Sequence, residues 1–189
     1  MIRVWTAAGW LMTAATVAAA QTSGGGPGKF TLTSADFAQG KTLAAAQVFN
    51  GFGCSGGNVS PALAWSNAPA GTKSFALLVH DPDAPTGSGW WHWVVYDIPA
   101  SASALPAGAG DPKKGLAPAG VQQGRTDFGT AGYGGPCPPP GKPHRYYFRL
   151  YALKVAKLEV PADSSAALIA FNVNAAALGK AELMGLYGR

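Results

Sequence analysis

Short apolar runs recur along the chain and predict a fold made mainly of β-strands. Each run is rich in aromatic or β-branched residues and is bounded by Gly, Pro, Asn or Asp, a pattern typical of strands. The runs are residues 30–32, 62–69, 73–81, 90–99 and 145–155. No period of roughly 20 to 50 residues recurs, which excludes a repeat architecture.

A helical pattern occurs only near the end of the chain, where we expect two short helices. Asp163 can cap residues 164–173, in which apolar residues lie three and four positions apart, and Asn174 can cap residues 175–187. Earlier in the chain, residues 101–133 form a long segment rich in Gly, Ala and Pro. Loops of that length in compact domains are usually functional.

The first twenty residues predict a secretory signal peptide. They carry Arg3, an apolar stretch and the small residues 18–20 as a cleavage site before Gln21. A transmembrane anchor is the alternative, but the apolar stretch is short and rich in Thr and Ala. We therefore expect a periplasmic or secreted protein with no anchor after cleavage. Residues 21–29 would be a flexible Gly-rich tether and residues 30–189 a single domain.

Charge and composition favour a globular, soluble domain. Hydrophobic residues make up 48% of the 189-residue chain and charged residues 12%, far from the composition of disordered chains. The net charge is +5, and loss of Arg3 would leave 13 basic against 9 acidic residues, a net charge of +4. Because the basic residues are spread along the sequence, we expect no nucleic-acid partner.

Cys54 and Cys137 are the two cysteines of the chain. An even count in an exported protein suggests one disulfide, and two free thiols are the alternative. A nucleophilic arrangement of Cys137 with His144 and Asp81 is conceivable. A cysteine among prolines with one available partner is more consistent with a bridge.

Three glycine-containing motifs do not fit their usual functions. Residues 51–56 match G-x-G-x-x-G, but Pro61 prevents the helix that a dinucleotide site needs. Residues 135–141 have the wrong spacing for a Walker A loop, and Pro143 stands where Ser or Thr would hold magnesium. The run TGSGW does not match G-x-S-x-G, the motif that presents the nucleophilic serine of many hydrolases.

Side chains alternate between the two faces of a strand, and this places several polar residues on the faces that point to the apolar interior. In residues 74–81, Asp81 ends an inward row and His80 points the other way. In residues 90–97, His92 shares its face with Val94 and Tyr96. In residues 144–150, His144 and Tyr146 share a face with two apolar residues, Phe148 and Leu150. Either histidine alone would usually be a hydrogen-bonded core residue, but together with Asp81 and Tyr146 they predict a pocket.

Two stretches carry a resemblance to a known family. DPDAPTGSGWWHWVVYDIP and GRTDFGTAGYGGPCPPPGKPHRYYFRLYAL resemble the signature regions of the phosphatidylethanolamine-binding protein family, also called Raf kinase inhibitor-like proteins, in its bacterial branch. GFGCSGGNVSPALAW is similar to the segment that precedes them. The resemblance covers residues 30–189. It implies an antiparallel β-sandwich with peripheral helices and a small anion-binding pocket at one end, in agreement with the strand pattern.

The resemblance also implies the residues of the pocket and a cis peptide bond at Ala84–Pro85. The ligand-binding residues are expected to be Asp81, His92, Gly135, Pro136, His144 and Tyr146. Prolines lack the N–H group, so imidazole N–H groups, the Tyr146 hydroxyl and one or two glycine N–H groups would hold an anion. Asp81 would orient a histidine or receive the ammonium of a zwitterion such as phosphoethanolamine. The lipid and kinase partners of eukaryotic members do not transfer.

Two classes of function remain open on the sequence. The first is a non-enzymatic binding protein without a cofactor, which takes small phosphorylated or zwitterionic ligands and regulates another protein. The second is a metal-assisted hydrolase with Asp81, His92 and His144 as a two-histidine, one-carboxylate site. A metal site would need an activated water and further hydrogen-bond acceptors that fix the two histidines. The sequence identifies neither, which favours the binding protein.

Overall fold

The computed structural model describes residues 1–2 and 28–189. The predicted signal peptide, beyond its first two residues, and residues 21–27 of the predicted tether lie outside the described residues. The elements of the described chain are as follows: β1 Thr31–Ser34, β2 Asn50–Gly51, β3 Cys54–Ser55, β4 Leu63–Ser66, β5 Ser74–Asp81, β6 Trp90–Pro99, β7 Ala104–Leu105, a 3-10 turn Pro112–Lys114, β8 Gln122–Gln123, β9 His144–Leu153, α1 Ala166–Ala176 and β10 Ala177–Tyr187.

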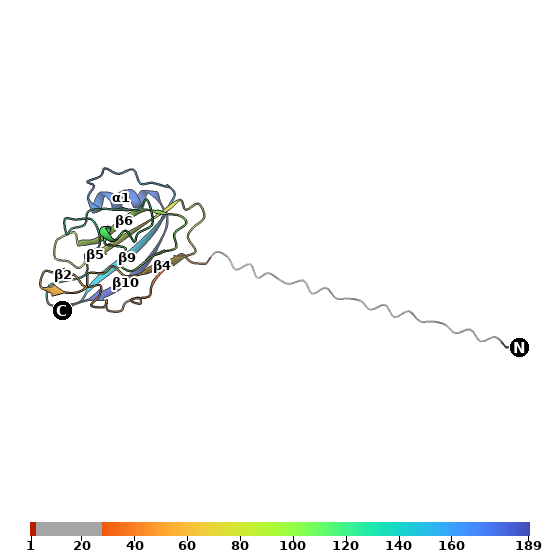
Figure 1. Ribbon diagram of the computed structural model, residues 1–189, viewed down its shortest axis with the longest axis horizontal. Helices are drawn as coiled ribbons and strands as arrows, with labels where there is room; N and C mark the ends of the chain where they lie inside the picture. Colours follow the sequence, from red (N-terminus) through yellow and green to blue (C-terminus); the bar gives the residue numbers. More distant parts are fainter. Residues whose placement is uncertain (3–27) are drawn as a thin grey trace.

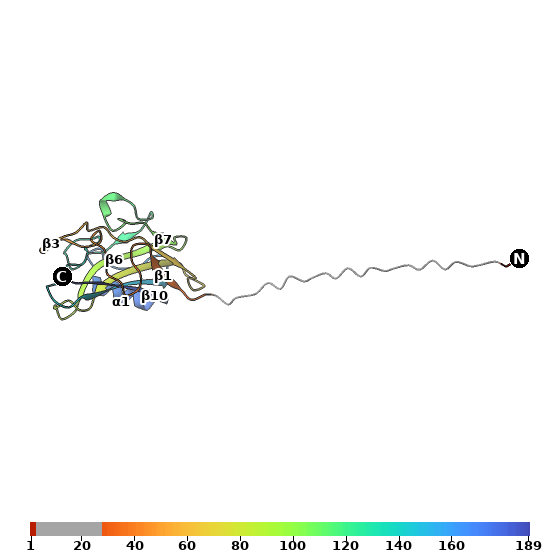
Figure 2. The ribbon, with the colours of Figure 1, turned by 90° about the horizontal axis from the view of Figure 1, so that it is seen from below.

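Two antiparallel sheets form a β-sandwich, as the family resemblance implied. The larger sheet has the strand order β10-β9-β5-β6-β8 and the smaller has the order β1-β4-β7, while β2 and β3 form a separate hairpin. Helix α1 covers the outer face of the larger sheet in Figure 1, and Figure 2 shows the curved strands of the sandwich from below. The mainly β fold class is therefore confirmed.

Two apolar clusters cover the two faces of strand β5. Phe75, Leu77 and Val79 pack between the sheets. Ala76 and Leu78 pack beneath α1 with Ile169. Because β5 is central and covered on both sides, nearly all of its residues are buried. This rigid central strand ends in Asp81, which fixes the position of that carboxylate.

The predicted second C-terminal helix is wrong, because residues 177–187 form β10. This strand pairs with β9 along its whole length, from Ala177 opposite Leu153 to Tyr187 opposite His144. Ala, Leu, Glu, Lys and Met are good helix formers, but burial of one strand face overrides that weak preference. The first helix is confirmed as α1, although its cap is Ser165, whose Oγ accepts from the Leu168 N–H at 3.2 Å, and not Asp163.

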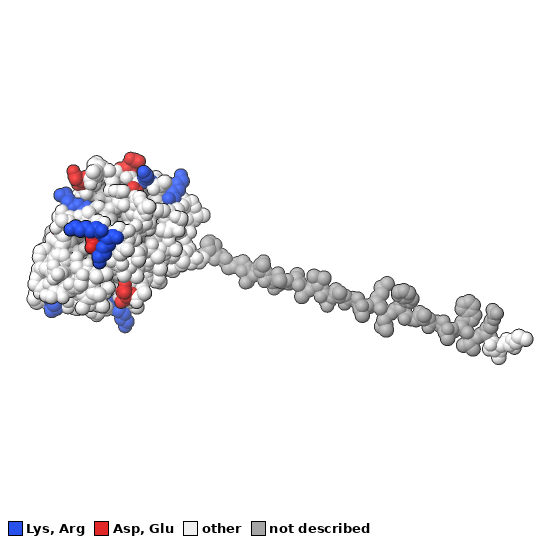
Figure 3. Space-filling view, viewed as in Figure 1, with Lys and Arg blue, Asp and Glu red and all other residues white. Residues whose placement is uncertain are grey.

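Charged side chains are scattered over the face drawn in Figure 3, with acidic and basic groups interspersed among uncharged surface. No helix of residues 1–2 and 28–189 is long and apolar enough to cross a membrane.

Candidate ligand-binding site

A cavity of about 180 Å³ opens where β5 ends and where β6 and β9 begin. Antiparallel pairing sets Asp81 opposite Trp90 of β6, and His80 opposite Tyr147 of β9, so the neighbouring inward residues converge on one point. We call it the Asp81 cavity. Its lining residues come from the strand ends and three loops: Phe52, Asp81, Ala84, Pro85, Thr86, Trp90, His92, Phe128, Cys137, Pro138, Pro139, His144 and Tyr146.

The inward orientation of His92 depends on an irregularity in β6. Val79 pairs with Trp93 but His80 pairs with Trp91, so His92 is an extra residue on its strand. Such a bulge reverses the alternation and re-aims a side chain. The prediction that His92 shares its face with Val94 and Tyr96 is therefore wrong. Those two residues pack beneath α1, whereas the His92 ring lies against Tyr146, with ring centroids 5.0 Å apart.

Asp81 fixes the ring of His144. Oδ2 of Asp81 accepts from Nδ1 of His144 at 2.7 Å, and Oδ1 accepts from the Asp83 N–H at 2.8 Å. The Asp81 side chain is only 3% exposed, so both of its oxygens are engaged within the protein. The ring is left with Nε2 as its second polar atom, which donates as well when the imidazole is protonated.

His92 is held as a neutral imidazole. Its Nδ1 donates to the backbone oxygen of Gly134 at 2.6 Å, and a carbonyl can only accept, so Nδ1 carries the proton. Burial lowers the pKa of His92 from 6.5 to about 4, because the protonated ring would lose its hydration. His92 is therefore expected to stay uncharged between pH 8 and pH 6. Its Nε2 is a hydrogen-bond acceptor in that range.

Tyr146 has a buried hydroxyl that makes no well-formed hydrogen bond with the described residues. The residue is 2% exposed, and within residues 1–2 and 28–189 its hydroxyl has no partner at normal geometry, although the Asp81 carboxylate lies near it. Burial and the charge of nearby Asp81 raise its pKa well above the ordinary value, so the hydroxyl keeps its proton. Buried polar groups are nearly always paired, and this one belongs to a residue that lines the Asp81 cavity.

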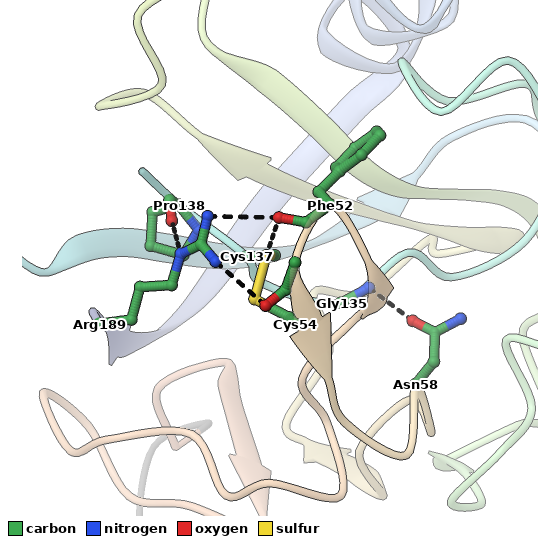
Figure 4. The surroundings of a disulfide bond; sticks show 8 residues. Phe52, Cys54, Asn58, Gly135, Cys137, Pro138 and Arg189 are labelled. Atoms are coloured by element: carbon green, nitrogen blue, oxygen red, sulfur yellow. Dashed lines mark hydrogen bonds between the residues drawn. A yellow bond between two sulfur atoms is a disulfide. The ribbon is translucent and has the colours of Figure 1, made fainter. Parts of the chain in front are cut away.

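Gly135 and Pro136 do not line the Asp81 cavity. The N–H of Gly135 donates to Oδ1 of Asn58 at 2.8 Å (Figure 4), and the oxygen of Pro136 accepts from the Phe49 N–H at 3.1 Å. A Cβ on Gly135 would stand 2.0 Å from the Gln47 oxygen. The glycine therefore permits close packing of two chain segments, and its N–H is not available to an anion.

The loop after β5 is fixed by an ion pair. The Arg145 guanidinium donates to both oxygens of Asp83, from Nη2 to Oδ1 at 2.6 Å and from Nε to Oδ2 at 2.9 Å. These hydrogen bonds lower the pKa of Asp83 from 3.8 to about 2. The Ala84–Pro85 bond is trans, so the predicted cis bond is wrong. The loop is therefore held by side-chain contacts and not by a cis turn.

The opposite wall of the cavity is cross-linked, and Figure 4 shows its parts. Cys54 and Cys137 form the disulfide that the cysteine count favoured, with Cα atoms 6.0 Å apart. The Arg189 guanidinium joins the same two segments. It donates to the oxygen of Pro138 at 2.7 Å and to the oxygens of Gly53 and Phe52 at 3.2 and 3.3 Å. The hairpin tip and the proline-rich loop thus form one rigid unit.

Sequence reasoning missed the aromatic residues of the cavity, Phe52, Trp90 and Phe128. Phe128 lies in the long segment 101–133, whose length indicated a function without indicating a residue. The residues proposed as metal ligands in the alternative function do line one cavity. Within residues 1–2 and 28–189, however, no three His, Cys, Asp or Glu side chains are grouped closely enough to hold a metal ion.

Comparison with known proteins gives a consistent result. The family model described as phosphatidylethanolamine-binding protein matches residues 33–188. The UPF0098 protein YbcL of Escherichia coli K12 is 52% identical over 159 residues, which are 84% of this chain and 87% of YbcL. The UPF0098 protein YbhB of the same organism is 47% identical over 156 residues, which are 82% of this chain and 98% of YbhB.

The crystal structure of E. coli YbcL, described as a member of the mammalian PEBP family, superposes with a TM-score of 0.83. It is 51% identical, and the match covers 86% of this chain and 99% of that chain. The fold and the site define an antiparallel β-sandwich protein with a small cavity at one end of its larger sheet. The chain belongs to the phosphatidylethanolamine-binding protein family.

Proposed function

We propose that this chain is an exported, non-enzymatic binding protein for small phosphorylated or zwitterionic molecules, such as phospholipid head groups. The observation that carries the proposal is the buried Tyr146 hydroxyl, which makes no hydrogen bond of normal geometry within residues 1–2 and 28–189 and belongs to the same cavity as His144 and Asp81. A ligand oxygen would accept this O–H and complete the hydrogen bonding of the site.

Each polar residue of the cavity has a distinct role in this proposal. His144 donates from Nε2 to a phosphate oxygen when its ring is protonated, and Asp81 orients the ring through Nδ1. His92 presents a lone pair, so it accepts from a P–OH group or from the ammonium of a zwitterion. Because both Asp81 oxygens are already engaged, the carboxylate orients His144 and leaves the ligand to the other groups.

The expected affinity is modest. Hydrogen bonds to charged groups contribute roughly 1.5 to 3 kcal/mol each, and the cavity offers two or three of them. After the cost of association, dissociation constants between about 1 μM and 1 mM are expected.

Two features of the chain support export. Residues 1–20 have the pattern of a cleavable signal. The Cys54–Cys137 disulfide is the kind of bond that forms and persists in an oxidising compartment such as the periplasm.

Calorimetric titration with phosphoethanolamine tests the binding function. We expect His144→Ala to weaken binding about tenfold or more. The matched control is His80→Ala, since His80 contacts the Ser88 oxygen and Trp91 on the other face of the sheet. Equal losses in both variants would contradict the proposal.

A further inference from the structure

Three aromatic rings from separate parts of the chain form one wall of the Asp81 cavity. Phe52 lies at the tip of the β2–β3 hairpin, Trp90 begins β6, and Phe128 lies in the long segment before β9. The Phe128 ring is the centre of the group. Its centroid is 5.9 Å from that of Phe52, with the rings nearly parallel, and 5.5 Å from that of Trp90, edge to face. A fourth ring, that of Phe49, also packs against Phe128, with ring centroids 4.6 Å apart.

Phe52 is exposed and has an unfavourable backbone conformation, yet it is fixed in place. The residue is 65% exposed, and its φ of +52° lies in the left-handed region that disfavours residues with a Cβ. The Arg189 guanidinium donates hydrogen bonds to the Phe52 and Gly53 oxygens, and the adjacent Cys54 is disulfide-bonded to Cys137 (Figure 4). A strained, exposed phenylalanine that is fixed by two independent cross-links does not serve the core. Positive φ at Phe52 and Gly53 is the usual geometry of a two-residue hairpin turn, but such turns favour Asn, Asp or Gly, so the turn itself does not account for a phenylalanine at position 52.

The chemistry of the lining residues separates the cavity into two parts. The polar side chains are those of Asp81, Thr86, His92, His144 and Tyr146, of which the Thr86 hydroxyl already donates to the Gly89 oxygen, and the lining residues include no Lys or Arg. The aromatic wall lies beside these groups in the same cavity. A ligand that places an anionic head against His144 and Tyr146 would therefore bring its next atoms against Phe52, Trp90 and Phe128.

We infer that Phe52, Trp90 and Phe128 form an aromatic subsite, which takes an aryl group attached to the anionic head of the ligand. This inference rests on the proposed function, since the head occupies the site of His144 and Tyr146. Aryl groups suit the wall because aromatic pairs gain energy from offset-stacked and edge-to-face contacts beyond the burial of area. The ligand class is then aryl phosphate monoesters and related aryl anions, in preference to small alkyl phosphates.

The test compares three phosphate monoesters with the same head in calorimetric titrations at pH 7. These are methyl phosphate, cyclohexyl phosphate and phenyl phosphate. We expect the native protein to bind phenyl phosphate about tenfold more tightly than methyl phosphate, with cyclohexyl phosphate between them. Phe52→Ala should lower the phenyl-to-methyl ratio of affinities towards one, and Phe52→Trp should keep most of the preference. Phe171→Ala is the matched control, because Phe171 is a 71% exposed phenylalanine on α1.

The outcomes separate the two proposals. Equal affinity of the native protein for all three esters would overturn the aromatic subsite and leave head-group binding in place. Equal affinity for the cyclohexyl and phenyl esters would overturn the selectivity for aromatic rings. No binding of any ester would overturn the proposed function and the subsite together. A similar loss of the ratio in Phe52→Ala and Phe171→Ala would show that Phe52 has no specific part in it.

Discussion

Asp81 and His144 are joined by a hydrogen bond of 2.7 Å between Oδ2 and Nδ1, although 63 residues separate them in the sequence. The second oxygen of the carboxylate accepts from the Asp83 N–H at 2.8 Å. A carboxylate can accept at both oxygens, whereas an amide has one acceptor and one donor. An amide at position 81 could accept from the Asp83 N–H only by turning its NH₂ group to the His144 Nδ1, so it could not also accept the Nδ1 proton of a protonated ring.

Asp81→Asn should weaken the binding of phosphoethanolamine about tenfold, because the amide must direct its NH₂ group either at the His144 Nδ1 or at the Asp83 N–H. Calorimetric titration measures the loss. Asp83→Asn is the matched control, since Asp83 pairs with Arg145 and is not among the residues that line the Asp81 cavity. A loss as large in Asp83→Asn would show that loop order matters and not the orientation of His144.

The stability of the fold should decrease in acid because of His92. The pKa of His92 is 6.5 in the unfolded chain and about 4 in the fold, so the unfolded chain binds more protons between those values. Stability is then fully present above pH 6.5 and is lost as the pH falls towards 4, by roughly 3 kcal/mol. Urea unfolding at several pH values measures this slope.

His92→Asn is the comparison for that slope, because an amide can still donate to the Gly134 oxygen but does not titrate. Between pH 6.5 and 4.5 the variant should lose distinctly less stability than the native protein. Asp83 does not interfere, since its pKa change, from 3.8 to about 2, lies below this range. Parallel slopes for the two proteins would mean that His92 is not the group responsible.

Most of the strands could be predicted because a short apolar run bounded by turn residues indicates a buried strand. Strands β5, β6 and β9 were visible as apolar runs, and their partners follow from antiparallel packing. Strand β10 was missed because its residues favour helix in isolation. Its exposed Lys180 and Glu182 alternate with buried Ala181 and Leu183, and this period of two was the signal that could have identified it.

The site was harder to predict, for three physical reasons. The orientation of His92 depends on a bulge, and alternation cannot show where an extra residue enters a strand. Gly135 is required by close packing against the Gln47 oxygen, a contact between segments far apart in the sequence. The aromatic wall combines Phe52 and Phe128 from loops without periodicity, so nothing in the sequence pattern brings them together.

The disulfide should make a large contribution to stability. Cys54 and Cys137 are 83 residues apart, and closing a loop of that length is worth about 4 kcal/mol in the chain-entropy model. A Cys54→Ala, Cys137→Ala double variant should lose about that much free energy of unfolding in urea. Reducing agent should destabilise the native protein and leave the double variant unchanged. Equal sensitivity of the two proteins to reducing agent would contradict the assignment.

Gly135 and Gly87 allow the packing role of a glycine to be separated from its backbone role. A Cβ at Gly135 would meet the Gln47 oxygen at 2.0 Å and the Phe49 nitrogen at 2.7 Å, and backbone atoms cannot rotate away. A Cβ at Gly87, which has φ +78°, would meet no atom within 4 Å from the rest of the described chain, its two neighbours aside. Gly135→Ala should therefore cost about 3 kcal/mol or more, and Gly87→Ala about 1 to 2 kcal/mol from backbone strain alone.

Urea unfolding of both variants, monitored by tryptophan fluorescence, measures the two losses. If Gly135→Ala kept its stability but lost phosphoethanolamine binding, position 135 would serve the ligand directly and not the packing of the two segments.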